Sequence, residues 1–225
     1  MPRISKGQHG GYAYHVINRG NGRATVFHKS QDYEAFLSLL AEAKKRHRVK
    51  IFGFCLMPNH FHFVLEPAHP TALSQFMQWL LTSHFRRYHW HYGGSGHIWQ
   101  GRFKSFPVQR DEHLTTVLRY ILQNPVRAGL AITTREWLWS SLRRQQLADP
   151  CSVGDERQWS DQLDELLREG QLIVVRECLN RQRPFGKPDW QAQMAAMFGL
   201  GSTLRPRGRP RDEWPLSLYN PAFGS

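Results

Sequence analysis

The sequence predicts an α+β fold of the ferredoxin-like (split βαβ) class, a four-stranded antiparallel sheet with helices on one face. Three observations support this prediction. Segments of strand and helix character follow in the order strand, helix, strand, strand, helix, strand, helix. The strand candidates 50–56 and 60–66 are separated only by the turn Met57-Pro58-Asn59, as in a hairpin. Long amphipathic helical patterns precede and follow that hairpin.

Local sequence features bound each element. The first strand, 12–18, is an aromatic and β-branched run that ends in a glycine-rich turn. The first helix is expected to start at Ser30, an N-cap residue, and to end in a basic cluster at 44–48. The other predicted elements are a helix over about 71–92, a strand over 98–108 and a helix from about 111 to 123.

The character of the sequence changes after about Asp149. We expect residues 1–149 to form the main domain, 150–200 a small helical C-terminal extension, and 201–225 a basic tail rich in arginine and proline. Helices are predicted at 161–179 and 190–198. The segment LRPRGRPR (204–211) cannot form an ordinary helix, because proline and glycine interrupt its four arginines.

The composition indicates a globular and strongly basic protein. Hydrophobic residues make up 40% of the 225, and 30 Lys+Arg against 18 Asp+Glu give a formal net charge of +12. Such a surplus favours a polyanionic partner, since phosphate neutralisation supplies most non-specific affinity for nucleic acid. No segment approaches the roughly 20 apolar residues that span a bilayer, so no membrane partner is expected. The beginning lacks the apolar stretch of a secretory signal, and three separated cysteines form no disulfide or metal pattern, which favours a cytoplasmic location.

A His-x-His pattern lies on the second strand of the predicted hairpin. Side chains alternate along a strand, so His60 and His62 share one face while Phe61 and Phe63 occupy the other. Two imidazoles one strand repeat apart can bind one divalent metal ion. The alternative is a polar strand face whose histidines only contact solvent.

A tyrosine and an asparagine are spaced for one helix face in the segment 118–130. Tyr120 and Asn124 are four residues apart and are therefore neighbours on a helix. A phenol can attack phosphorus as a covalent nucleophile, and an amide oxygen can complete the ligand set of a hard metal ion. The alternative is that Tyr120 packs in the core with the neighbouring Leu118, Ile121 and Leu122.

Three segments together resemble a known family. In their order and spacing, MPNHFHFVLEP, GHIWQGRFKS and RYILQNPVRAGL are similar to the single-tyrosine HUH transposases, above all the REP-associated tyrosine transposases, and RPRGRPR near the end adds to the likeness. The resemblance covers residues 10 to 145 well. It implies that His60 and His62 are the paired metal-binding histidines and that Tyr120 is the nucleophile. The third ligand in insertion-sequence relatives is a glutamine four residues after the tyrosine; this chain has Asn124 there and Gln123 one residue earlier.

The resemblance also implies a mechanism and a substrate. A divalent ion, Mg²⁺ or Mn²⁺, would bind an oxygen of the scissile phosphate, and Tyr120 would attack in line to leave a 3′-hydroxyl and a 5′-phosphotyrosine. The expected activity is therefore that of a metal-dependent DNA transposase that cleaves and rejoins single-stranded, hairpin-forming (REP-like) DNA.

Several basic side chains are predicted to bind this DNA. Arg86 and Arg87 lie in a run that mixes positive charge with aromatic rings, and so do Arg102 and Lys104, as single-strand binding requires. The alternative is a solvated helix end and an ordinary strand. Arg127, within the tyrosine motif, is assigned to the same role. The tail core Gly208-Arg209-Pro210 resembles an AT-hook, which would place the side chains of Arg207, Arg209 and Arg211 in a narrow A·T minor groove; the alternative is a flexible charged terminus.

Two other functions stay open at this point. The chain could be a non-catalytic DNA-binding regulator derived from such an enzyme, against which the intact set of tyrosine, histidines and asparagine argues. It could also be an RNA-binding module, since ferredoxin-like sheets with aromatic faces bind RNA. Metal-binding histidines on the sheet face would argue against that. The sequence is compatible with a monomer or a homodimer.

Overall fold

The computed structural model describes residues 8–151, 163 and 165–205. Four strands and two long helices form its first half. In chain order these are β1 (Ala13–Arg19), the 3-10 helix η1 (Asn21–Arg23), α1 (Ser30–Arg46), β2 (Val49–Met57), β3 (His60–Pro67), α2 (Ala72–Tyr92) and β4 (Lys104–Val108). The remaining elements are α3 (Glu112–Leu122), α4 (Asn124–Arg127), η2 (Gln145–Leu147), α6 (Glu169–Arg181), α7 (Pro188–Met197) and α8 (Gly201–Leu204).

The four strands form one antiparallel sheet in the order β2-β3-β1-β4. The hairpin of β2 and β3 lies at one edge, and β1 lies between β3 and β4. Since α1 connects β1 to β2 and α2 connects β3 to β4, this is the split βαβ arrangement. The predicted fold class is confirmed.

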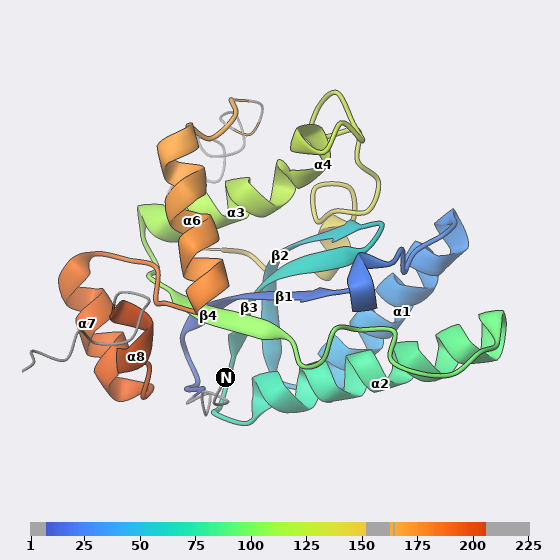
Figure 1. Ribbon diagram of the computed structural model, residues 1–225, viewed down its shortest axis with the longest axis horizontal. Coiled ribbons are helices and arrows are strands. Elements are labelled where there is room, and N and C mark those ends of the chain that lie inside the picture. The colour runs from blue at the N-terminus through green and yellow to red at the C-terminus, as the bar shows by residue number, and fades with distance from the viewer. Residues whose placement is uncertain (1–7, 152–162, 164, 206–225) are drawn as a thin grey trace, which may run out of the picture.

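Helices cover both faces of the sheet (Figure 1). Helices α1 and α2 pack on one face over a core that includes Phe36, Phe61 and Phe63. The prediction that helices lie on one face is correct for α1 and α2. It is wrong for α3 and α6, which lie on the opposite face. The reason is that α3 presents an apolar side to that face and buries Val117 against a second core cluster with Val64.

A glycine in β2 allows α3 to approach the sheet closely. The β2–β3 register shifts between Ile51 and Gly53, which marks a bulge. A Cβ at position 53 would lie only 2.7 Å from Cδ2 of Leu118 on α3. The lack of a side chain at Gly53 therefore allows Leu118 of α3 to pack closely against β2.

Two element boundaries differ from the predictions by more than two residues. Strand β4 begins at Lys104 and not at residue 98, because Gly96 and Gly101 adopt positive φ angles and Trp99 forms only an isolated bridge to Gly20. The helix predicted for 161–179 begins at Glu169; residues 163 and 165–168 are not helical, and 161, 162 and 164 lie outside the described residues.

The C-terminal extension packs onto the sheet domain. Helix α6 contributes Leu172 and Val175 to the cluster that α3 also builds. Phe198, which follows α7, lies 6.3 Å from Tyr14 of β1 between ring centroids. Helix α8 occupies the start of the predicted tail, and Arg207, Arg209 and Arg211 lie outside the described residues. Within the described ranges, no helix is both long and apolar enough to cross a membrane.

Candidate active site

The alternation of β3 places its two histidines on the face that α3 covers. Phe61 and Phe63 point into the core under α1 and α2. His60 and His62 lie on the other side with their ring centroids 5.0 Å apart, His60 half-buried and His62 only 2% exposed. Both histidines therefore face a covered site and do not simply meet solvent.

A third histidine, which the motif analysis did not find, belongs to this site. His15 lies in β1 and is fully buried. Its ring stacks on that of His62 with centroids 5.1 Å apart, and its Nε2 lies 2.9 Å from Nδ1 of His62. The available sequence signal was alternation, since His15 is the polar residue between Tyr14 and Val16, which both face the α1–α2 core.

Helix α3 brings Tyr120 against these rings. The tyrosine ring meets His62 edge-on with a centroid distance of 5.8 Å, and it meets His15 in the same way at 6.1 Å. Tyr120 is 6% exposed, so its ring is largely enclosed. The proposed nucleophile and the proposed metal-binding histidines thus come together from segments about 60 residues apart in the sequence.

Asn124 begins α4 and does not continue α3, which ends at Leu122. The amide oxygen of Asn124 accepts a hydrogen bond from Arg127 (3.1 Å), and its Nδ2 is buried without a partner among the described residues. The guanidinium of Arg127 also lies over the Tyr120 ring, 4.9 Å from its centroid, and donates to the Tyr120 carbonyl. Arg127, which is predicted to contact DNA, thus lies over the Tyr120 ring and is hydrogen-bonded to the backbone of Tyr120 and to the side chain of Asn124.

Gln123 has a different position from Asn124. Its side chain is fully buried. Its Nε2 donates to the carbonyls of Leu163 (2.9 Å) and Glu165 (2.8 Å), and its Oε1 accepts from the backbone N–H of Leu167 (3.1 Å) and from Arg127 (3.2 Å). Every hydrogen-bonding group of this amide holds the C-terminal extension or the adjacent turn.

Burial keeps the site histidines neutral at ordinary pH. Desolvation lowers the pKa of His15 to about 3 and that of His60 to about 4, where Arg19 adds to the effect. It also holds the pKa of His62 well below its usual range, helped by the neighbouring histidines, Arg127 and Arg19. Neutral imidazoles keep a lone pair available for a metal ion.

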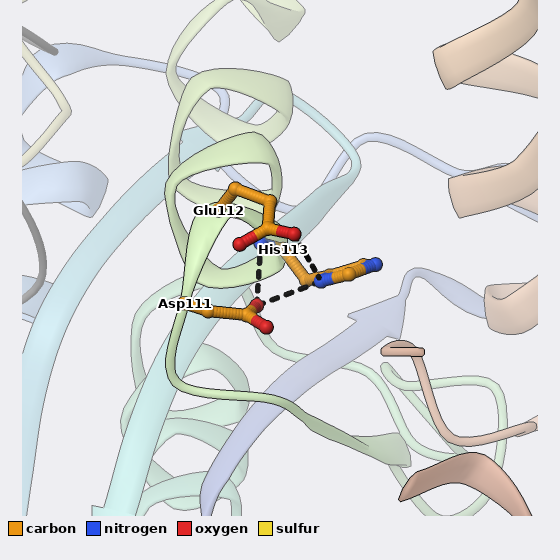
Figure 2. Close-up of side chains that lie close together, drawn as sticks. All are labelled: Asp111, Glu112 and His113. Atoms are coloured by element: carbon orange, nitrogen blue, oxygen red, sulfur yellow. Dashed lines mark hydrogen bonds and ion pairs between the residues drawn. The ribbon is translucent and has the colours of Figure 1, made fainter. Parts of the chain in front are cut away.

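A separate group at the other end of α3 could also hold a metal ion. The ligand atoms of Asp111, Glu112 and His113 all lie within 4.8 Å of one another, the one such group of His, Cys, Asp or Glu in the described part of the chain (Figure 2). Asp111 caps α3 by accepting from the His113 N–H (2.9 Å) and from its Nδ1 (2.7 Å). This group lies about 10 Å along the helix from Tyr120, at a rise of about 1.5 Å per residue. Its contacts are explained by helix capping.

Basic side chains flank the histidines on the same sheet face. Residues paired across strands project to one side, and His60 pairs with Arg19, while Ile17 pairs with both His62 and Lys104. Lys104 and Arg102 are exposed. Arg19 was not among the predicted DNA-binding residues because the sequence places it in the glycine-rich turn after the first strand.

The C-terminal half of α2 forms a second basic surface. Arg86 and Arg87 are exposed there, and Trp90 is 83% exposed. A cavity of about 350 Å³ lies beside it, between residues 21–26 and the end of α2. Exposed arginines next to an exposed indole combine positive charge with an aromatic ring, the two features typical of surfaces that bind single-stranded nucleic acid.

The site thus combines a tyrosine with neutral histidines on one face of a four-stranded antiparallel sheet. Comparison with known families matches residues 9–124 to the family described as "Transposase IS200 like". Because this match covers more than half of the 225 residues, the chain belongs to the IS200-like transposase family.

The chain is also similar to three individual proteins. A protein of Haemophilus influenzae, named a REP-associated tyrosine transposase, is 26% identical over 125 residues, which are 51% of this chain and 70% of that protein. Among solved structures, a REP-associated tyrosine transposase bound to a REP hairpin covers 69% of this chain and 90% of its own, with 19% identity and a TM-score of 0.49. A transposase from Deinococcus radiodurans R1 covers 50% and 88%, with 17% identity and a TM-score of 0.39.

Proposed function

We propose that the chain is a metal-dependent transposase that cleaves and rejoins single-stranded, hairpin-forming DNA of the REP type through a 5′-phosphotyrosine on Tyr120. The observation that carries this proposal is the edge-on contact between the rings of Tyr120 and His62, 5.8 Å apart between centroids. Membership of the transposase family supports DNA strand transfer as the reaction. The REP-type hairpin rests on the motif resemblance and on the name of the Haemophilus influenzae relative.

The residues beside Tyr120 fit a divalent ion. Neutral His60 and His62 offer imidazole nitrogens, and Asn124 offers an amide oxygen that accepts one hydrogen bond from Arg127 within the described residues. The four hydrogen bonds of Gln123, in contrast, engage its amide nitrogen and its amide oxygen. We therefore assign His60, His62 and Asn124 as ligands of Mg²⁺ or Mn²⁺. When bound, such an ion would offset the charge on a non-bridging oxygen of the scissile phosphate.

The covalent step is carried by Tyr120. Its hydroxyl oxygen attacks the phosphorus, a bond from that oxygen to phosphorus forms, and the bond from phosphorus to the 3′-oxygen breaks. The phenol loses its proton and the departing 3′-oxygen gains one. Attack by another DNA 3′-hydroxyl reverses these changes and restores the phenol. The phosphoester is conserved throughout, so no nucleotide cofactor is required.

The substrate strand would be held by the basic surfaces that flank the site. The first group is Arg19 and Lys104, which lie on the sheet face of the histidines, with the exposed Arg102 two residues before Lys104. The second group is Arg86, Arg87 and Trp90 on α2. We propose that the first group binds phosphates next to the cleavage position and the second binds a more distant part of the strand by charge and stacking.

An RNA-binding module of the usual kind would use an open sheet face, and in the described part of the chain helices cover both faces of the sheet. One face of the sheet is covered by α1 and α2, and α3 and α6 pack over the other. Bases could not stack on strand aromatics there without displacing a helix layer.

A covalent-adduct assay tests the proposal. The protein is incubated with labelled single-stranded DNA carrying a REP-type hairpin, with Mg²⁺ or Mn²⁺, and run on a denaturing gel. We expect an adduct from the natural protein and from the control Tyr12→Phe, and none from Tyr120→Phe. An adduct with Tyr120→Phe would remove Tyr120 as the nucleophile. Hairpin binding without any adduct would favour a non-catalytic regulator.

A further inference from the structure

The buried contact between His15 and His62 constrains where their protons lie. The two facing nitrogens, Nε2 of His15 and Nδ1 of His62, are 2.9 Å apart. At this distance one proton lies between them, because two bare nitrogens would repel and two N–H groups would clash. The Nδ1 of His15 is buried and has no partner among the described residues, so the contact with His62 is the hydrogen bond that accounts for the position of this ring.

Only one of the two possible proton positions leaves His62 able to bind a metal ion. If His15 donates, the neutral His62 ring carries its own proton on Nε2 and offers no free lone pair. If His62 donates from Nδ1, its Nε2 is bare and available. A metal-binding histidine normally donates its other ring nitrogen to a neighbouring acceptor in this way.

His60 has a matching arrangement. Its Nδ1 lies 2.6 Å from Oδ1 of Asn59, an atom that can only accept. The orientation of this amide is determined at its other end, where Nδ2 of Asn59 donates to the carbonyl of Arg23 (3.1 Å). His60 therefore also presents Nε2, and both histidines use the same nitrogen.

From these contacts we propose that His15 is a positioning residue for the metal site: it accepts the Nδ1–H of His62 and thereby makes Nε2 of His62 the metal-binding nitrogen. The inference rests on the proposed function, since it assigns a role toward the metal of that site. His15 does not itself bind the ion, because its one engaged nitrogen faces His62 and its other is enclosed.

Two substitutions separate acceptance of a hydrogen bond from mere filling of space. His15→Leu keeps a similar volume and removes the acceptor, while His15→Gln keeps an acceptor at the end of the side chain. Mn²⁺ binding is measured by loss of the free-ion signal in electron paramagnetic resonance, with His60→Ala as the control that removes a ligand. Urea unfolding of each variant reports stability.

We expect His15→Leu to bind Mn²⁺ about 10- to 100-fold more weakly than the natural protein, and His15→Gln to stay within about threefold. Urea unfolding shows that each variant is folded under the titration conditions, so that a weaker affinity is not due to unfolded protein. Equal weakening by leucine and glutamine, or no weakening by leucine, would overturn the role of His15 while leaving the proposed function intact. If the natural protein binds no Mn²⁺, or binds it as well after His60→Ala, the metal site itself is wrong.

A measurement on the natural protein requires no substitution. The ¹⁵N shifts of the imidazole rings distinguish a protonated nitrogen from a bare one. In the Mg²⁺-saturated protein we expect the proton of His62 on Nδ1. A proton on Nε2 of His62 would refute the inference.

Discussion

Replacing Gln123 with leucine tests which of two adjacent amide side chains, Gln123 or Asn124, binds the metal ion and which stabilises the fold. The Gln123 side chain is fully buried and makes four hydrogen bonds. It donates two to backbone carbonyls of the extension. It accepts one from the backbone N–H of Leu167 and one from the guanidinium of Arg127. Leucine fills similar space but makes none of these bonds, so the change leaves polar groups of the extension without partners.

The size of the effect follows from these contacts. A typical hydrogen bond contributes about 1 kcal/mol net, and a buried group left unpaired costs about 1–3 kcal/mol. The bonds to Glu165 and from Arg127 are only partly buried, so water can replace them. We therefore expect Gln123→Leu to lower the free energy of unfolding by about 2–4 kcal/mol, from the two buried bonds to Leu163 and Leu167. Mn²⁺ affinity should change less than about threefold, far below the effect expected for a ligand.

Asn124→Ala is the matched substitution. It removes an amide whose Nδ2 is buried without a partner in the described residues and one bond to Arg127, so stability should fall by less than about 1 kcal/mol. Mn²⁺ affinity should fall at least about tenfold, because a proposed ligand is lost. Urea unfolding and Mn²⁺ titration measure both quantities for both variants.

The reversed pattern would refute this assignment. If Gln123→Leu weakens Mn²⁺ binding as much as Asn124→Ala does, the glutamine is the ligand and its bonds to the extension break when metal binds. If Gln123→Leu unfolds at the same urea concentration as the natural protein, the hydrogen bonds described here contribute nothing measurable to stability.

Three other changes have defined outcomes. Gly53→Ala should lower the unfolding free energy by about 1–3 kcal/mol, because the new Cβ would lie 2.7 Å from Cδ2 of Leu118, and an unchanged urea midpoint would show that α3 can shift freely. Burial lowers the pKa of His84 to about 4, so between pH 6.5 and 4 the unfolded chain takes up a proton that the folded one does not. Stability should therefore fall on acidification by up to about 1.4 kcal/mol per pH unit from this residue, and His84→Leu should show a shallower slope in urea unfolding at pH 7, 6 and 5; equal slopes would contradict this. Arg86→Ala combined with Arg87→Ala should reduce the slope of log binding constant against log salt concentration by about 1.4 for single-stranded DNA. Arg46→Ala on α1 should leave this slope unchanged. An unchanged slope in the double variant would show that Arg86 and Arg87 do not contact the phosphates.

The sheet and its two crossover helices could be predicted because each has a local signature. The turn at Pro58 separates two runs of strand character, and glycines end α2. The face on which α3 packs has no such signature. An amphipathic pattern says that one side is buried but not against which layer, and the close approach at Gly53 becomes visible only when strand register is known.

The site could be predicted in part. His60 and His62 stand out because their spacing matches the strand repeat. His15 does not stand out, because it is a single histidine in an apolar strand. Its contact with His62 can be recognised only once the pairing of β1 with β3 is known. Likewise, the spacing from Tyr120 favoured Asn124 over Gln123, but the function of Gln123 depends on residues 163–167, for which the sequence analysis predicted a helix.

The hydrogen bonds of Gln123 also have a consequence for the order in which the protein is completed during synthesis. When the first 150 residues have left the ribosome, all four strands and Tyr120 are available, and folding can begin from the N-terminal side. The backbone groups that hold the turn after α3, at Leu163, Glu165 and Leu167, emerge later. The junction that carries Asn124 and Arg127 can therefore receive these hydrogen bonds only after all four strands have been synthesised. During synthesis the histidines of β1 and β3 emerge first, and the backbone groups that hold the end of α3 through Gln123 emerge last.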